Sequence, residues 1–264
     1  MKRKQSVRSI LTIGDGNLSY SLSLAAMYKD NGDQVQLTAT TYDGLEGLKS
    51  KYGEVKMEET ISTLVSLKAK VLHGVDATCL SNSLNGSKFD LIIFMHPLVP
   101  SDERFAFIQS RGDHFATVII NRLMITKFLR SAQPLLADEN SEIHITMKNV
   151  YPYSWWRIDA LAALAPPLQY LSCNESDTSG LTHYESRNVE RDQPFPLTAS
   201  LTFVYGQRPP KATAERPGNF KCEVCACRFS GQGDQAKHNA SKKHQKRVDL
   251  EISWTEYLKT ISLD

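Results

Sequence analysis

Long apolar runs and cysteines are both scarce in this chain of 264 residues. No apolar stretch approaches the ~18–20 residues that a membrane-spanning helix needs, and the start MKRKQSVR lacks the apolar segment of a secretory signal. Of the five cysteines, Cys79 and Cys173 stand alone in the sequence. The other three crowd together near the C-terminus, a distribution that suits a reducing compartment and a local metal site better than a disulfide framework. We therefore expect an intracellular protein.

Net charge is also small, at +2, but it is unevenly distributed. Positions 207–247 carry ten basic and three acidic residues, so this stretch has a charge of +7 and the rest of the chain −5. A basic module attached to a mildly acidic body is typical of a protein that binds a polyanion.

Short apolar runs alternate with helical patterns over most of the chain, which predicts an α/β fold with a mainly parallel sheet covered by helices on both faces. The last two predicted strands have no convincing helix between them and are expected to form an antiparallel pair at one sheet edge. The predicted strands are 9–14, 34–43, 70–75, 89–96, 142–148, 169–174 and 199–206, and the predicted helices are 19–29, 44–68, 116–136 and 154–165.

A proline-containing stretch without hydrophobic periodicity follows the last predicted strand, which is typical of a linker. A compact basic segment and then an amphipathic helix pattern come after it. The predicted organisation is an α/β domain at 1–206, a linker at 207–219, a small module at 220–247 and a C-terminal helix at 248–264.

The hydrophobic pattern of the stretch ILTIGDGNLSYSLSLA, residues 10–25, does not decide between a strand and a helix after the glycine turn. The alternation in LSYSLSL is typical of a strand. A helix is favoured because predicted strands flank the stretch and Asn31-Gly32 forms a natural helix end, with Asn17 or Ser19 able to cap the start. A strand, a Gly-x-Gly turn and a helix together present backbone N–H groups to a polar or anionic cofactor.

The Gly14-Asp15-Gly16 turn alone is equally compatible with a plain tight turn. Asp43 ends the second predicted strand, where an acid can accept hydrogen bonds from a ribose diol, and Asp76 ends the third, near an expected adenine. Each acid alone is more often a turn residue or a helix cap. Together they predict a nucleoside site at the carboxyl ends of three strands.

These stretches, with VLHGVDAT, FDLIIFMHP, EIHITMKNVYPYSWW and the late HYESRNV, resemble the 25S rRNA (uridine-N3)-methyltransferase-like domain over residues 8–206. The resemblance implies a Rossmann-like class I methyltransferase with seven strands, the last one antiparallel. It also implies S-adenosyl-L-methionine as cofactor and a uridine nitrogen of RNA as methyl acceptor. The cofactor-binding residues that it implies are Gly14, Asp15, Gly16, Asn17, Asp43 and Asp76.

One motif departs from the family pattern, at the end of the fourth predicted strand. The family has Asn-Phe-Pro-His there, whereas this chain has Met95-His96-Pro97-Leu98. His96 is a candidate base for removing the uridine proton, with a core or surface histidine as the alternative. After the fifth strand, Tyr153, Trp155 or Trp156 is a candidate for stacking on an extruded base, and at least one of the tryptophans is expected to be a core anchor.

The module at 220–247 contains Cys222-x2-Cys225-x12-His238-x5-His244, a spacing that predicts a C2H2 zinc finger with Zn²⁺ held by two thiolates and two imidazoles. Cys227 is a spare thiol, and Phe220 and Phe229 are expected to form a small apolar cluster. The module resembles matrin-type fingers, which implies binding to structured or double-stranded RNA. The predicted phosphate contacts are Lys237, Lys242, Lys243, Lys246 and Arg247.

The sequence thus predicts an S-adenosylmethionine-dependent RNA methyltransferase with a zinc finger, and the family and the finger imply a nuclear, nucleolar location. A non-catalytic RNA-binding protein with a degenerate methyltransferase domain is the alternative. A nicotinamide-dependent enzyme is disfavoured because Ser19 stands where a dinucleotide fingerprint has its third glycine.

Overall fold

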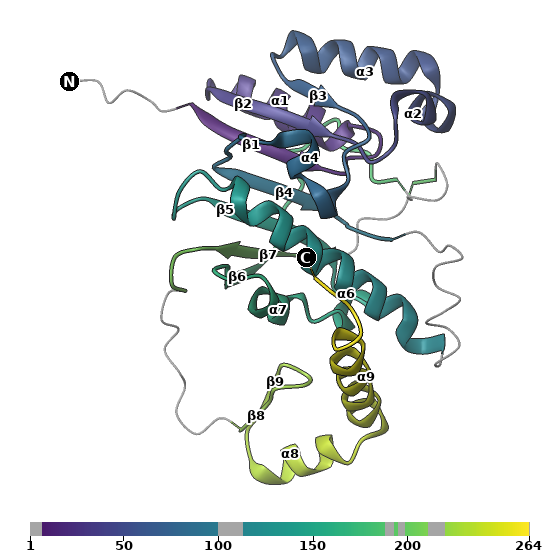
Figure 1. Cartoon of the computed structure of the whole chain (residues 1–264), viewed down its shortest axis with the longest axis vertical. Coiled ribbons are helices and arrows are strands. Elements are labelled where there is room, and N and C mark those ends of the chain that lie inside the picture. Colours follow the sequence, from purple (N-terminus) through teal and green to yellow (C-terminus); the bar gives the residue numbers. More distant parts are fainter. Residues whose placement is uncertain (1–6, 100–112, 188–192, 195–198, 211–219, 264) are drawn as a thin grey trace, which may run out of the picture. The chain divides into compact units, whose positions relative to one another are not determined.

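The computed structural model divides the chain into two compact units. The first, here called the sheet unit, comprises Met1–Ser101 and Ile120–Pro210, and the second, the C-terminal unit, comprises Asp102–Ile119 and Lys211–Asp264. The residues that the structure describes are 7–99, 113–187, 193–194, 199–210 and 220–263 (Figure 1).

A seven-stranded sheet in the order β3-β2-β1-β4-β5-β7-β6 forms the centre of the sheet unit. Neighbouring strands are parallel except for β7, which is antiparallel to both β5 and β6. The predicted antiparallel pair at one edge is therefore confirmed. The strands are β1 (Arg8–Ile13), β2 (Val35–Thr40), β3 (Lys70–Leu72), β4 (Leu91–Met95), β5 (Glu142–Lys148), β6 (Gln169–Glu175) and β7 (Ser200–Gly206).

The central strands are buried on both faces, which explains their nearly continuous apolar sequences. Ile10 and Ile93 pack with α1, α2 and α3 on one face, whereas Phe94 meets Phe128 of α6 with ring centroids 4.9 Å apart on the other. The helices of the sheet unit are α1 (Ser19–Asp30), α2 (Leu45–Tyr52), α3 (Glu54–Ser66), α4 (Ser81–Leu84), α6 (Asp113–Ala132, which begins in the other unit) and α7 (Ile158–Leu161).

Two predicted helices differ from the observed ones. The predicted helix at 44–68 is divided at Gly53, whose φ of 92° is incompatible with a helix, into α2 and α3. The predicted helix at 154–165 is reduced to α7 and short 3₁₀ turns, because Arg157 takes a left-handed conformation with φ 47°. Both interruptions come from single backbone conformations that hydrophobic periodicity does not report.

The stretch that alternates Leu and Ser is helical, as predicted, and its serines are buried because each one has a partner. The Ser21 and Thr12 hydroxyls are 2.7 Å apart, joining α1 to β1. Ser23 Oγ accepts a hydrogen bond from His183 N, and Ser19 Oγ accepts one from Glu185 N. The period of two therefore reflects hydrogen bonding on two sides of one helix rather than a strand.

Besides the start of α6, the described part of the C-terminal unit is a short hairpin followed by helices. Ser241 Oγ accepts a hydrogen bond from His244 N at 3.2 Å and caps α9, which then continues across the predicted boundary at residue 247. Among the described residues no helix is long and apolar enough to span a membrane. The elements are β8 (Phe220–Cys222), β9 (Cys227–Phe229), α8 (Gln232–Asn239) and α9 (Lys242–Leu258).

Candidate functional site

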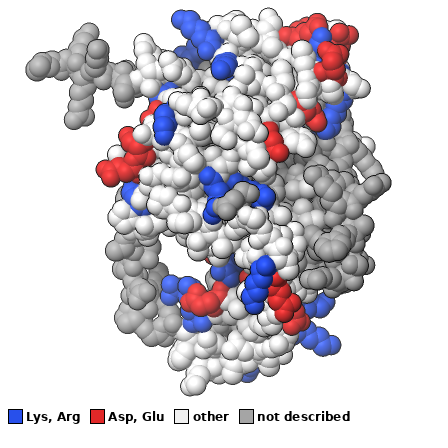
Figure 2. All heavy atoms as spheres, in the orientation of Figure 1, with Lys and Arg blue, Asp and Glu red and all other residues white. Residues whose placement is uncertain are grey.

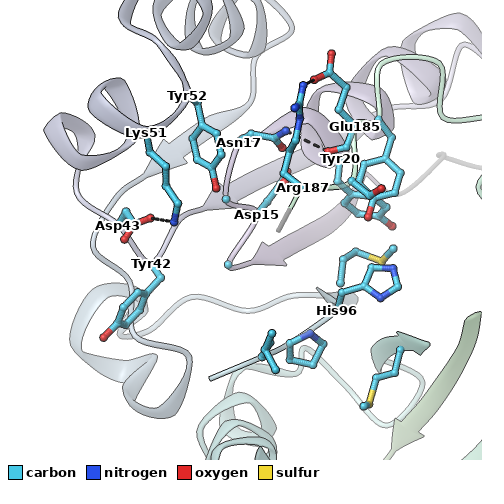
Figure 3. A pocket seen from close by; sticks show the side chains of 18 of the residues that line it. Asp15, Asn17, Tyr20, Tyr42, Asp43, Lys51, Tyr52, His96, Glu185 and Arg187 are labelled. Atoms are coloured by element: carbon cyan, nitrogen blue, oxygen red, sulfur yellow. Dashed lines mark hydrogen bonds and ion pairs between the residues drawn. The ribbon is translucent and has the colours of Figure 1, made fainter. Parts of the chain in front are cut away.

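A cavity of about 260 Å³ lies at the carboxyl ends of the parallel strands, the usual ligand position in open α/β sheets (Figure 3). Its lining comes from segments at or just beyond the ends of four different strands and from a late segment between β6 and β7. These segments are 14–17, 42–43, 95–98, 147–148 and 184–187, joined by Tyr20, Lys51, Tyr52 and Tyr153.

The turn after β1 brings backbone close to this cavity. Gly14 has φ 61°, a left-handed conformation that favours glycine. A Cβ at Gly16 would lie 2.8 Å from the hydroxyl oxygen of Tyr52, which lines the same cavity. Neither position accommodates a side chain without a shift, so the turn presents backbone to whatever occupies the cavity.

Asp15 and Asn17 line the cavity, yet their polar groups already bond to the protein. The Asp15 carboxylate accepts a hydrogen bond from Ser21 N at 2.7 Å in the first turn of α1, and burial raises its pKa. Asn17 Oδ1 accepts from Ser19 N at 3.2 Å, and Asn17 Nδ2 donates to Glu185 O at 3.1 Å. Both side chains therefore hold the turn and the late segment in place.

Asp43 lies beyond the end of β2 and faces the cavity, as the predicted role at a ribose requires (Figure 3). Its Oδ2 is 3.4 Å from Lys51 Nζ on α2, an ion pair that the sequence interpretation missed.

Asp76 does not join the other predicted residues: it is absent from the cavity lining and is exposed. Its Oδ1 accepts hydrogen bonds from Thr78 N and Thr78 Oγ1, both at 2.8 Å, and so caps the 3₁₀ turn Ala77–Cys79. This is the helix-cap alternative that the sequence left open.

His96 lines the cavity beyond the end of β4 in an unusual backbone conformation. Its φ is 48°, and it precedes Pro97, which further disfavours a helical backbone. His96 N donates to Thr146 O at 2.8 Å, so the ladder with β5 holds it there. Burial and the nearby charge of Lys148 lower the pKa of His96 to about 4, which keeps its imidazole neutral at physiological pH.

The aromatic residues after β5 divide into different roles. Trp156 is fully buried and is the expected core anchor, so it does not stack on an extruded base. Trp155 packs edge-on against Tyr151, with ring centroids 5.3 Å apart. Tyr153 lines the cavity and is half-buried, which raises the pKa of its hydroxyl. Tyr153 is thus the one of the three candidates that faces the cavity.

The late segment 184–187 contributes cavity residues whose roles the sequence did not indicate. Tyr184 packs edge-on against Tyr20 at 5.4 Å. Glu185 Oε2 lies 2.7 Å from Lys56 Nζ and 2.8 Å from an Arg187 nitrogen. These contacts and the bonds to α1 fix the segment over the turn after β1 (Figure 3).

The four predicted metal ligands of the C-terminal unit come together. Their donor atoms all lie within 4.8 Å of one another, and the distances from His244 Nδ1 are 3.6 Å to each cysteine sulfur and 3.1 Å to His238 Nε2. Two thiols and two imidazoles at this separation suit a tetrahedral zinc ion. The donor set therefore fits the metal that the spacing implies.

Other side chains of the module, residues 220–247, have roles that differ from those expected. Phe220 is exposed rather than part of a cluster, whereas Phe229 packs on the His238 ring at 4.8 Å. Cys227, in contrast, stands outside the four-ligand cluster as predicted, with its Sγ 3.8 Å from His238 Nε2. Arg247 donates to Cys225 O at 3.2 Å and so braces the ligand loop.

The remaining predicted phosphate contacts are exposed. In the view of Figure 2, basic and acidic side chains of the described residues are interspersed. The exposed predicted contacts are Lys237, Lys242, Lys243 and Lys246 on α8 and α9.

A family model described as BMT5-like rRNA (uridine-N3-)-methyltransferase matches residues 11–188. The match extends from β1 to the late segment of the cavity, and it covers more than half of the chain. The chain belongs to this family. The resemblance inferred from the glycine turn and the strand ends is thereby confirmed.

Two curated proteins of Arabidopsis thaliana are similar to this chain. A heavy metal-associated isoprenylated plant protein is 29% identical over 209 residues, which are 78% of this chain and 38% of that protein. An uncharacterized protein is 29% identical over 216 residues, which are 78% of this chain and 96% of that protein. The chain therefore spans well under half of the first relative and nearly all of the second.

Solved structures with a similar arrangement share little sequence with this chain. A class I S-adenosylmethionine-dependent methyltransferase from Listeria monocytogenes has 14% identity and a TM-score of 0.46, covering 80% of this chain and 58% of its own. The fibrillarin pre-rRNA processing protein of Methanococcus jannaschii has 12% identity and a TM-score of 0.41, covering 76% of this chain and 66% of its own.

Proposed function

We propose that this protein transfers a methyl group from S-adenosyl-L-methionine to N3 of a uridine in ribosomal RNA. The observation that carries the proposal is the cavity at the strand ends, where the glycine turn, Asp43 and His96 meet in a chain of the uridine-N3-methyltransferase family. The residues of the cavity suit both partners of such a reaction.

The cofactor end of the cavity lies between the turn after β1 and Asp43. The backbone of the turn after β1 would lie against the polar methionine part, and the Asp43 carboxylate suits a ribose diol. When bound, S-adenosyl-L-methionine supplies an activated methyl group on its sulfonium sulfur. A Cβ at Gly14 would press on the Phe94 ring and one at Gly16 on the Tyr52 hydroxyl, so the two glycines keep the turn in this form.

The acceptor end lies between His96 and Tyr153. A uracil ring stacked on Tyr153 gains contact energy of about 1–3 kcal/mol. Its N3 carries a proton that must leave before the nitrogen lone pair attacks. His96 lines this end of the cavity and is the candidate acceptor of that proton, and the N3 electron pair would then form the bond to the methyl carbon as the methyl–sulfur bond breaks. Positioning of the two reactants supplies most of the rate.

The module at 220–247 would act as an RNA-binding zinc finger. Zn²⁺ held by Cys222, Cys225, His238 and His244 would order the hairpin and the start of α9. The exposed lysines of α8 and α9 would contact phosphates, which makes the RNA affinity strongly dependent on salt. A nuclear, nucleolar location accompanies a ribosomal RNA substrate.

Transfer of tritium from labelled cofactor to ribosomal RNA tests the proposal. We expect incorporation by the zinc-loaded protein, a large loss in Asp43→Ala, and no loss in Lys70→Met, which changes an exposed lysine on β3. If wild type and Asp43→Ala incorporate equally little while RNA is still bound, the protein is a non-catalytic RNA-binding member of the family. If calorimetry also detects no cofactor binding, the cavity has another ligand.

A further inference from the structure

Lys148, the last residue of β5, lies beside the candidate base at the acceptor end of the cavity. In the parallel pairing of β4 and β5, Met95 faces Thr146, and His96 N donates to Thr146 O at 2.8 Å. The next residues of both strands, His96 on one and Met147 and Lys148 on the other, line the same cavity. The sheet register thus brings an amino group and an imidazole to one place.

Each carboxylate that lines the cavity has a partner elsewhere among the described residues. Asp15 bonds to Ser21 N, Asp43 pairs with Lys51, and Glu185 pairs with Lys56 and Arg187 (Figure 3).

The pKa shifts of two residues indicate that the Lys148 amino group is partly enclosed and lies near His96. Partial burial lowers the pKa of Lys148, and its charge contributes to the lowered pKa of His96. The Lys148 charge at this place favours an occupant of the acceptor end that is negative or becomes negative.

Resting on the proposed function, we propose that Lys148 is a catalytic residue that selects uracil and stabilises it as the N3 proton leaves. When the N3–H bond breaks, its electron pair stays on the ring and spreads onto O2 and O4, while the proton goes to His96. The Lys148 ammonium donates a hydrogen bond to O4, where this charge develops. The N3 pair then forms the N–C bond as the methyl–sulfur bond breaks, and that bond's electrons stay on sulfur.

This arrangement also distinguishes uracil from cytosine. Cytosine carries an amino group at C4, and an N–H donor there faces the ammonium donor instead of accepting from it. An interaction that strengthens as negative charge develops accelerates the reaction, whereas one that is equal in both states only tightens binding. A phosphate contact by Lys148 would be of the second kind, because a phosphate is charged throughout.

The experiment compares Lys148→Met, Lys148→Arg and the surface control Lys70→Met in the full, zinc-loaded chain. Two RNA probes are used: 25S ribosomal RNA transcribed with UTP, and the same RNA transcribed with 4-thio-UTP, whose base has a more acidic N3–H. Methyl transfer is measured as kcat and KM for each RNA, and calorimetry measures cofactor affinity.

We expect Lys148→Met to lower kcat on the uridine RNA about 100-fold, the effect of losing one donor to a developing oxyanion. On the thiouridine RNA we expect less than about 10-fold, because the more acidic base needs less help. Lys148→Arg should recover part of kcat, and cofactor affinity should not change.

Four results would overturn the inference. An equal loss on both RNAs, or a change in KM alone with a reduced salt dependence, would make Lys148 a structural or phosphate-binding residue. Unchanged kcat in Lys148→Met would remove it from the reaction. Wild-type protein without activity on either RNA would instead overturn the proposed function, and this inference with it.

Discussion

The Cys/His module and the cavity of the sheet unit are built from contacts with very different separations along the sequence. The metal ligands are separated by at most 22 positions, whereas the bond from Asn17 to Glu185 that closes the cavity spans 168 positions. Within residues 220–247 the buried side chains are Cys222 and His244, which are themselves ligands. The sheet unit instead has a large apolar core on both faces of its sheet. We therefore expect the first region to depend on a metal for its structure, whereas the second depends on burial.

The largest expected effect follows from that difference. Removing the metal with a chelator, or changing His244→Ala, should unfold the module, because structural zinc contributes about 10–16 kcal/mol to such folds. The sheet unit should stay folded and keep its cofactor affinity. Two-dimensional amide NMR with calorimetry checks both statements.

Cys227→Ser is the matched control for the module, because this thiol lies close to His238 but outside the four-ligand cluster. It should retain the metal. Unfolding of both units after chelation would show that they are not energetically separate.

Cofactor binding in the cavity should depend on the Asp43 side chain. Asp43→Ala should weaken S-adenosyl-L-methionine binding by about 2 kcal/mol, or roughly 30-fold, since hydrogen bonds to a charged acceptor have this strength. Calorimetry measures the affinity, and circular dichroism verifies the fold. A change below twofold would mean that the ribose lies elsewhere.

The same difference in sequence separation determines which features the sequence could predict. The strands, the antiparallel edge pair, the glycine turn and the metal ligands are local patterns, and the structure has each of them. The ion pair of Asp43 with Lys51, and the bonds that hold Glu185 over the turn, join residues from different elements. No spacing rule reports such contacts, because they depend on how the elements pack.

The division of the predicted helix at Gly53 was missed for a different reason. The apolar positions of α2 and α3 continue with helical spacing, so the period alone predicts one helix. The φ of 92° at Gly53 breaks it. Glycine was the available signal, because it adopts this conformation at little cost.

Burial of His96 should make the free energy of unfolding of the sheet unit depend on pH. Its pKa of about 4 in the folded protein lies below the 6.5 of an exposed histidine, so the unfolded chain binds the proton more readily between these values. The free energy of unfolding should therefore fall as the pH drops from 6.5 towards 4, with a loss of up to about 2 kcal/mol at pH 5.

Urea unfolding of wild type and His96→Asn at pH 7.5 and pH 5 measures this effect. Asparagine tolerates the left-handed backbone, and the comparison cancels the loss of metal that acid causes in the module. The wild type should lose more stability than the variant. Equal losses would mean that His96 is protonated as easily in the folded protein as in the unfolded chain.

The smallest effect is expected at Asp76, and it separates two acids that look alike in the sequence. Asp76 caps a 3₁₀ turn and is absent from the cavity lining, whereas Asp43 faces the cavity. Asp76→Ala should therefore cost about 1 kcal/mol of stability, the usual value of a lost cap, and change cofactor affinity less than about twofold. Calorimetry on Asp76→Asn, which keeps an acceptor for Thr78, completes the comparison. A loss of affinity as large as that in Asp43→Ala would show that Asp76 turns towards the adenine when the cofactor binds, and that the predicted nucleoside site includes a third strand end.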